Sequence, residues 1–144
     1  MDLSLSFEKI IPSSFQIKTL YKVLQQREYS ISNEGPPSFQ DHKDFVSDHP
    51  YRHWYLIYKK SNCIGSVYVH YDNSIGINIV SSITTKTIDQ ILVFIKQTLK
   101  PLKPVSSLRY KDFFLNVPIK NRKLQSALGE LGYTSTQISF VLRK

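Results

Sequence analysis

Three histidines and one arginine near the middle of the chain have side chains suited to proton transfer and anion binding. A histidine side chain ordinarily titrates near neutral pH, as a general base must, and the candidates are His49, His53 and His70. Arg52 stands among three aromatic residues, Tyr51, Trp54 and Tyr55. Its guanidinium could bind a phosphate or carboxylate, with the rings as a platform beside it. These are the candidate catalytic and substrate-binding residues.

Each of these residues also has a purely structural interpretation. His49 precedes Pro50 and could simply end a helix and bond to a backbone group. His53 and His70 fall in expected strands, where a histidine is often a surface or packed residue. The aromatic side chains could pack a sheet, and Arg52 could be solvated. The choice between these interpretations depends on the elements that position the residues.

Length and composition favour one soluble globular domain over residues 1–144. Hydrophobic residues make up 41% and charged residues 21%. A single cysteine, Cys63, excludes an internal disulfide and a cysteine-based zinc site, and we expect no metal. The sequence contains no apolar run near the roughly 20 residues that a membrane span needs, and its start does not resemble a signal peptide. We therefore expect a cytoplasmic protein without membrane attachment.

Positive charge predicts an anionic partner. The chain has 19 Lys and Arg against 11 Asp and Glu, a net charge of +8. Nucleic acid, a phosphorylated metabolite and a phosphate-bearing cofactor all fit that charge. Aromatic residues alternate with lysines between positions 51 and 60, which would suit a single-stranded nucleic acid. No known nucleic-acid motif accompanies them, so this function is the least favoured.

Hydrophobic periodicity predicts the elements that must position these residues. Alternation predicts a strand over about 2–10, and Ser13 and Ser14 open a helix whose apolar stripe runs from Ile17 to Leu24. Residues 30–38 are expected to form a loop. Ser38, with Asp41 three residues later, predicts the start of a second helix that ends near residue 48.

The second half of the chain begins with three expected strands, 53–59, 63–71 and 74–80, joined as a meander of hairpins. A helix capped by Thr84 or Thr85 follows and ends before Pro101. A strand over 107–117, a helix ended by Gly132 and a strand over 135–143 complete the chain. The predicted fold is a mixed α/β (α+β) sheet with the order β-α-α-β-β-β-α-β-α-β.

This order and two short motifs resemble the GNAT superfamily of N-acetyltransferases. Asn121, Gly132 and Tyr133 occupy the places of the family's closing signature, in the run NRKLQSALGELGY. The run IGSVY from Ile64 is similar to the family's third strand. The stretch HPYRHWY from His49 is similar to small acetyltransferase-like proteins of surface-polysaccharide and sugar-nucleotide synthesis.

The resemblance implies transfer of an acetyl group from acetyl-CoA to the amine of a small, anionic acceptor, such as an amino sugar or sugar nucleotide. In the family, free backbone groups of the fourth strand bind the pantetheine arm, which corresponds here to Asn78, Ile79 and Val80. The start of the next helix binds the pyrophosphate. The matching residues, with Asn121 on the pantetheine arm, are Thr84, Thr85, Lys86, Thr87 and Ile88.

Several residues depart from the family pattern. Thr84 stands where the family has Arg or Gln, Thr87 where it has Gly, and Asp89 where it has Gly or Ala. The side chains at 87 and 89 would crowd a backbone that must approach phosphate closely, and Asp89 adds a repelling charge. Leu128 replaces a tyrosine that often protonates the leaving thiolate. The alternative function is therefore a GNAT-like binding module without catalysis. Open strand edges would allow a homodimer.

Overall fold

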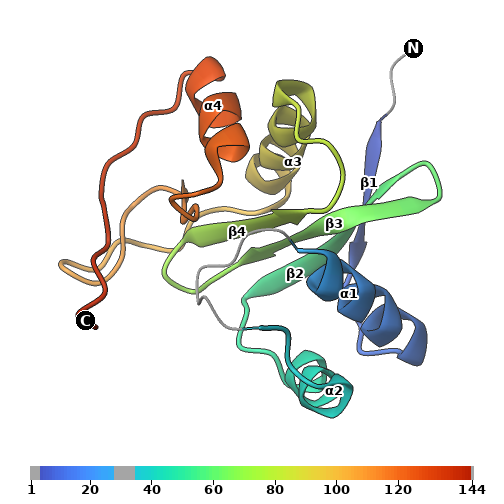
Figure 1. Cartoon of the computed structure of the whole chain (residues 1–144). Helices are drawn as coiled ribbons and strands as arrows, with labels where there is room; N and C mark the ends of the chain where they lie inside the picture. The colour runs from blue at the N-terminus through green and yellow to red at the C-terminus, as the bar shows by residue number, and fades with distance from the viewer. Residues whose placement is uncertain (1–3, 28–34, 144) are drawn as a thin grey trace.

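One five-stranded mixed sheet forms the centre of the molecule (Figure 1). The computed structural model describes residues 4–27 and 35–143. The strands lie in the order of the sequence; β1 to β4 are antiparallel and β4 pairs in parallel with β5. They span Leu5–Lys9 (β1), His53–Lys59 (β2), Asn62–Val69 (β3), Ser74–Ile79 (β4) and Phe114–Leu115 (β5). The predicted mixed α/β class and the three central strands are confirmed.

Helices cover both faces of this sheet. The first pair, α1 (Ser14–Gln26) and α2 (Phe39–Ser47), lies against one face (Figure 1). The second pair, α3 (Thr85–Thr98) and α4 (Arg122–Glu130), packs against the other. Successive side chains of β2 point to opposite faces of the sheet. Trp54 and Leu56 face the first helix pair, whereas Tyr55 and Ile57 face the second.

In the described part of the chain, each helix is preceded by a residue whose side chain accepts a hydrogen bond from the first turn. Such a bond satisfies a backbone N–H that has no partner within the helix. The donor–acceptor distances lie between 3.1 and 3.2 Å. The four caps are Ser13, Ser38, Thr84 and Asn121. The helix starts predicted from Ser38 and Thr84 are confirmed.

Asn73 holds the loop that follows α3 beside the start of β4. Its side chain is fully buried, and its amide donates to the carbonyls of Leu102 and Tyr110 at 2.9 and 2.8 Å. The side-chain Oδ1 of Asn73 accepts from the Leu102 N–H at 2.8 Å. β5 pairs with β4 only at Ser74 and Ile75, the first two residues of β4.

Two predicted strands were wrong in extent or existence. The strand expected over 107–117 shrinks to the two residues of β5. The strand expected over 135–143 does not form in the described chain, and Phe140 and Leu142 are 84% and 99% exposed. An alternating pattern needs a neighbouring edge to pair with, and β5 offers only two residues. The expected first strand begins at Leu5, and positions 1–3 and 28–34 lie outside the described residues.

The end of α4 follows the prediction. Gly132 adopts φ +91°, a left-handed conformation that favours glycine. Its N–H donates to the Gly129 carbonyl at 3.0 Å, and the Tyr133 N–H donates to the Leu128 carbonyl at 3.0 Å. These bonds satisfy carbonyls at the helix end. In the described residues, no helix is long and apolar enough to cross a bilayer.

Candidate functional site

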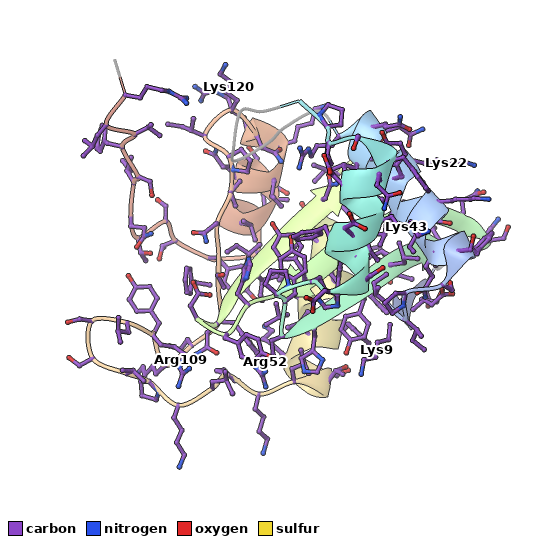
Figure 2. The ribbon with its side chains drawn as sticks, turned by 90° about the horizontal axis from the view of Figure 1, so that it is seen from below. Lys9, Lys22, Lys43, Arg52, Arg109 and Lys120 are labelled. Carbon is purple, nitrogen blue, oxygen red and sulfur yellow. The ribbon has the colours of Figure 1, made fainter. Side chains whose placement is uncertain are left out.

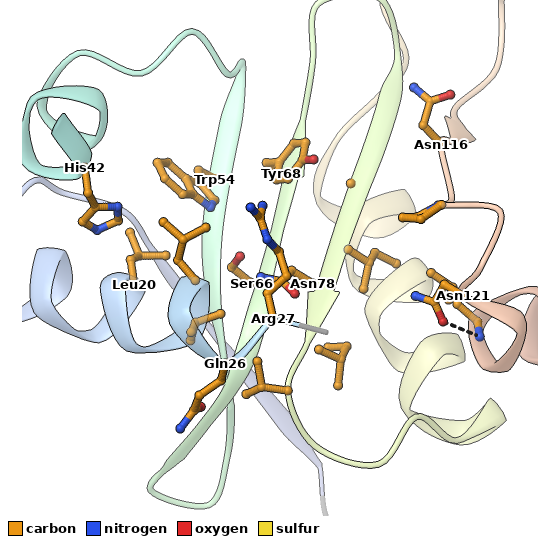
Figure 3. A pocket seen from close by; sticks show the side chains of 18 of the residues that line it. Leu20, Gln26, Arg27, His42, Trp54, Ser66, Tyr68, Asn78, Asn116 and Asn121 are labelled. Atoms are coloured by element: carbon orange, nitrogen blue, oxygen red, sulfur yellow. Dashed lines mark hydrogen bonds between the residues drawn. The ribbon is translucent and has the colours of Figure 1, made fainter. Parts of the chain in front are cut away.

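A cavity of about 760 Å³ extends from the α1–α2 layer across the sheet to the start of α4 (Figure 3). Its floor is formed by side chains of β2, β3 and β4, including Trp54, Ser66 and Asn78. At its far end it passes between β4 and the segment that carries Asn116 and Asn121. The cavity therefore follows the gap that opens where β5 ends and β4 continues.

The exposed edge of β4 is set by the register of β3 and β4. Val80 N–H donates to Ile64 O, and His70 N–H donates to Ser74 O, each at 2.9 Å. In an antiparallel pair such bonds recur at every second residue, so the even-numbered residues of β4 bond to β3. The N–H and C=O of Ile77 and Ile79 consequently face the gap. Among the predicted residues, Ile79 presents its backbone there, whereas Asn78 and Val80 direct theirs toward β3.

Two tyrosines form one wall of the cavity. The rings of Tyr51 and Tyr68 stack with centroids 4.2 Å apart, and Trp54 meets Tyr51 edge-on at 4.9 Å. Tyr68 lies across Gly76 of β4, where a Cβ atom would come within 2.0 Å of the Tyr68 Cζ. Burial raises the pKa of both phenols, so both remain protonated hydrogen-bond donors.

Of the four predicted substrate residues, the structure places Tyr51 and Trp54 at the cavity and the other two away from it. Tyr55 lies on the opposite face of β2 and packs edge-on against Phe94, with centroids 5.1 Å apart. Arg52 does not line the cavity, and its Nη1 donates to the Lys100 carbonyl at 2.9 Å. The period of two along β2 explains why Tyr55 and Trp54 diverge.

None of the three predicted histidines lines the cavity. His49 accepts a hydrogen bond from the Tyr51 N–H at its Nδ1, 3.2 Å away. His70 packs edge-on against Tyr51 at 4.9 Å. His53 lies on the other face of β2, beside Tyr55. His49 and His70 therefore pack beside Tyr51 and hold it in place, and the general-base role expected for the three histidines stays a prediction.

The histidine that does line the cavity is His42, which sequence reasoning missed. It is 4% exposed, and its Nε2 lies 2.9 Å from the Ile17 carbonyl. Because a carbonyl only accepts, Nε2 carries the hydrogen, and the bond ties α2 to α1. The signal was its position four residues before Val46, the other buried residue of α2.

Burial lowers the pKa of His42, His49 and His53, and this predicts a loss of stability in mild acid. Near and below pH 6.5, the ordinary histidine pKa, these three side chains bind more protons in the unfolded chain than in the folded chain. The free energy of unfolding should therefore fall as pH drops from about 7.5 to about 5.5, and the melting temperature with it. His42→Gln should lessen that pH dependence, because glutamine can donate to Ile17 O without titrating. An unchanged slope would contradict this assignment.

Known structures resemble this arrangement. No protein-family model and no curated protein matches the sequence. An acetyltransferase from Thermus thermophilus superposes with a TM-score of 0.67 at 13% identity, over 93% of this chain and 90% of that one. The spermidine N-acetyltransferase of Vibrio cholerae, a dodecamer, gives a TM-score of 0.57 at 16% identity, over 94% and 82%. The aminoglycoside N-acetyltransferase AAC(6')-Iy, in complex with CoA, gives 0.60 at 7% identity, over 100% and 97%.

The chain has the GNAT fold. Within it, the start of α3 borders a second hollow lined by residues of α3 and α4. Thr84 and Thr85 line this hollow with Arg122, Lys123 and Glu130. The Thr85 hydroxyl donates to the Glu130 carboxylate. Two cations and one acid therefore surround the position where the GNAT resemblance predicts pyrophosphate.

The other residues predicted for that helix start have different placements. The Thr87 N–H donates to Thr84 Oγ1 at 3.1 Å, so the cap already uses it. Ile88 is fully buried, and its N–H donates to the Thr84 carbonyl at 3.1 Å. Lys86 is exposed and does not line the hollow. Of the residues predicted to bind pyrophosphate, Thr84 and Thr85 are the two that line this hollow.

Asn121, which the GNAT resemblance predicts on the pantetheine arm, borders the cavity at the start of α4. The residue is 7% exposed, its Oδ1 accepts from the Leu124 N–H at 3.2 Å, and it borders the cavity opposite β4 (Figure 3). It therefore caps α4 and faces the gap at the same time. Leu128, at the place of the GNAT tyrosine, packs against the core under α3. Tyr68 is the phenol over β4 in this chain.

The positive side chains are dispersed over the surface. Figure 2 shows Lys22 of α1 and Lys43 of α2 on one side, and Arg52 and Arg109 at another edge of the molecule. Lys120 lies apart from both pairs. The aromatic residues near position 55 are divided between two faces of the sheet. This distribution differs from the continuous basic surface with exposed stacking rings that single-stranded nucleic acid requires.

Proposed function

We propose that this protein is an N-acetyltransferase that uses acetyl-CoA and a small amine. The observation that carries the proposal is the open edge of β4 at Ile77 and Ile79, inside a cavity that leads to the start of α3. An edge of this kind can pair with an amide-containing chain as an added strand would. Acetyl-CoA, when bound, would supply an acetyl thioester for transfer to the amine.

The residues of the chain fit this chemistry in three places. The N–H and C=O of Ile79 would pair with the pantetheine amides. Arg122 and Lys123 would face the phosphates at the start of α3. The neutral phenol of Tyr68 would donate a hydrogen bond or proton beside β4, in place of the missing tyrosine at 128.

Thermal melting with acetyl-CoA tests the proposal. Acetyl-CoA at one hundred times its dissociation constant should stabilise the fold by about 2.7 kcal/mol. Desulfo-CoA and adenine nucleotides serve as partial-ligand controls. Only the molecules with a pantetheine arm, acetyl-CoA and desulfo-CoA, should reach β4. If full acetyl-CoA gives no upward shift of the melting temperature, acetyl transfer is wrong for this chain. With binding established, amino sugars and sugar nucleotides enter the acceptor screen first.

Glu130→Gln should tighten the binding of coenzyme A. Glu130 places a carboxylate at the positive end of α3, where it competes with phosphate for the same donors. Removing its charge should raise affinity about two- to fivefold. Asp112→Asn removes an equal charge from the exposed loop before β5 and should leave affinity unchanged. Calorimetric titration compares the two variants, and equal affinities would contradict the role of Glu130.

The Thr85–Glu130 contact also favours a second candidate, a GNAT-fold binding module that no longer uses acyl-CoA. In that case neither the natural chain nor Glu130→Gln would be stabilised by acetyl-CoA, although both would fold. Turnover of any amine would eliminate this candidate. We also expect a homodimer, because the outer edges of β1 and β5 have no strand partner in the described residues.

A further inference from the structure

Arg27 brings a positive charge into the cavity on the side of α1 and α2. It caps the C-terminal end of α1, is partly buried and lines the cavity. Figure 3 shows its side chain directed toward the strands that carry Trp54 and Tyr68. Its charge acts on the phenols of Tyr51 and Tyr68, where it opposes the rise in their pKa. Arg27 therefore lies beside the aromatic wall, which is formed by Tyr51, Trp54 and Tyr68.

The Arg27 guanidinium has no acidic partner among the described residues that line the cavity. Asp41 is the one acid in that lining; it is exposed on α2 and forms no ion pair with Arg27. Arg52 differs, because its guanidinium is engaged by the Lys100 carbonyl outside the cavity. A partly desolvated guanidinium is costly unless an anion pairs with it.

Trp54 adds a second donor to this wall. It is 8% exposed, and its Nε1–H has no hydrogen-bond partner in the described part of the chain. Buried indole N–H groups usually find an acceptor. Two donors that lack an acceptor among residues 4–27 and 35–143, Arg27 and Trp54, thus lie on the same side of the cavity.

We propose that the acceptor amine also carries an anionic group, a carboxylate or a phosphate, and that Arg27 binds it with the Trp54 Nε1–H as a second donor. This inference rests on the proposed function and assigns the acceptor to the α1–α2 side of the cavity. A guanidinium can donate to two oxygens of a carboxylate or of a phosphate at once. The feature that the two groups share is therefore a pair of anionic oxygens. The rings of Tyr51 and Tyr68 then face the uncharged part of the acceptor.

Three amino sugars that share one amine separate these possibilities. Glucosamine has no anionic group, glucosamine 6-phosphate has a phosphate, and muramic acid has a carboxylate. Binding of each is measured by calorimetry with CoA present, and acetylation by release of free thiol. We expect one charged sugar to bind at least about tenfold more tightly than glucosamine, as a charge-assisted bond contributes. Which of the two charged sugars does so identifies the group.

Two arginine variants locate the site. Arg27→Gln should remove the advantage of the charged sugar, a loss of about 10- to 100-fold. Arg52→Gln removes an equal charge outside the cavity and should keep the advantage within about twofold. Trp54→Phe keeps an aromatic ring without the N–H and should lose part of the advantage of the charged sugar. Melting curves of all variants verify that each folds.

The outcomes distinguish this inference from the proposed function. Equal binding of the three sugars, or an advantage that survives in Arg27→Gln, overturns the role of Arg27. If acetyl-CoA binds and amines are acetylated without that advantage, the inference alone fails. If acetyl-CoA does not bind while the Arg27-dependent advantage persists in its absence, the proposed function fails and the anion site stands.

Discussion

Ile79→Pro should weaken acetyl-CoA binding by about 10- to 100-fold while the chain still folds. The Ile79 N–H faces the gap beside β4 and takes no part in the pairing with β3. A proline is tolerated where a strand's N–H is not used by the sheet. The substitution therefore removes the donor that would meet the pantetheine arm. Calorimetric titration with acetyl-CoA measures the loss.

Two further variants control for the other effects of that change. Ile79→Ala removes the same packing against the core but keeps the N–H, so it should lower stability and retain binding. Asn78→Pro removes a donor that bonds to β3 and should unfold the sheet instead. If Ile79→Pro binds acetyl-CoA as tightly as Ile79→Ala does, the edge of β4 is not the binding groove.

Gly76→Ala should destabilise the fold by about 1–3 kcal/mol and disrupt the acceptor side of the cavity. The added Cβ would lie 2.0 Å from Tyr68 Cζ and 2.3 Å from its hydroxyl oxygen. Tyr68 cannot stay in place, and its displacement breaks the stack with Tyr51. Denaturant unfolding gives the stability change, and the charged amino sugars report the damage to the cavity.

A double-mutant cycle isolates the cause. Tyr68→Leu removes the ring atoms that the new Cβ would meet. In that background Gly76→Ala should cost less than about 0.5 kcal/mol, because the clash is gone. Equal costs in both backgrounds would show that the backbone at Gly76, and not the ring over it, is responsible.

The candidate site illustrates which of its residues can be found from sequence. Thr84 and Asn121 were predicted from cap chemistry and family motifs, both of which are local, and both face the cavity or its neighbouring hollow. Arg27, His42 and Tyr68 were missed. Each enters the cavity through the packing of distant segments: α2 on α1 for His42, β3 beside β4 for Tyr68, and the end of α1 against the sheet for Arg27. No pattern within a single segment encodes those contacts.

Arg52 was predicted as a substrate residue because it stands beside aromatic residues in the sequence. Arg52 precedes β2, and its side chain turns away to the Lys100 carbonyl, so adjacency in sequence did not give a shared surface. Arg27 is distant in sequence from Tyr51 and Tyr68, yet it acts on both phenols. Arg27 lies near these rings because it ends α1, and the packing of α1 on the sheet sets the direction of that helix.

The sequence by itself determined the order of most elements, their caps and the mixed sheet, because periodicity and capping act over a few residues. The tertiary structure decided which edge of β4 is open, which arginine meets the aromatic wall and which histidine is buried. It also decided that residues 135–143 remain unpaired, since a strand exists only when another edge offers its backbone groups. Local propensity selects an element, whereas register and packing between distant segments select its partners.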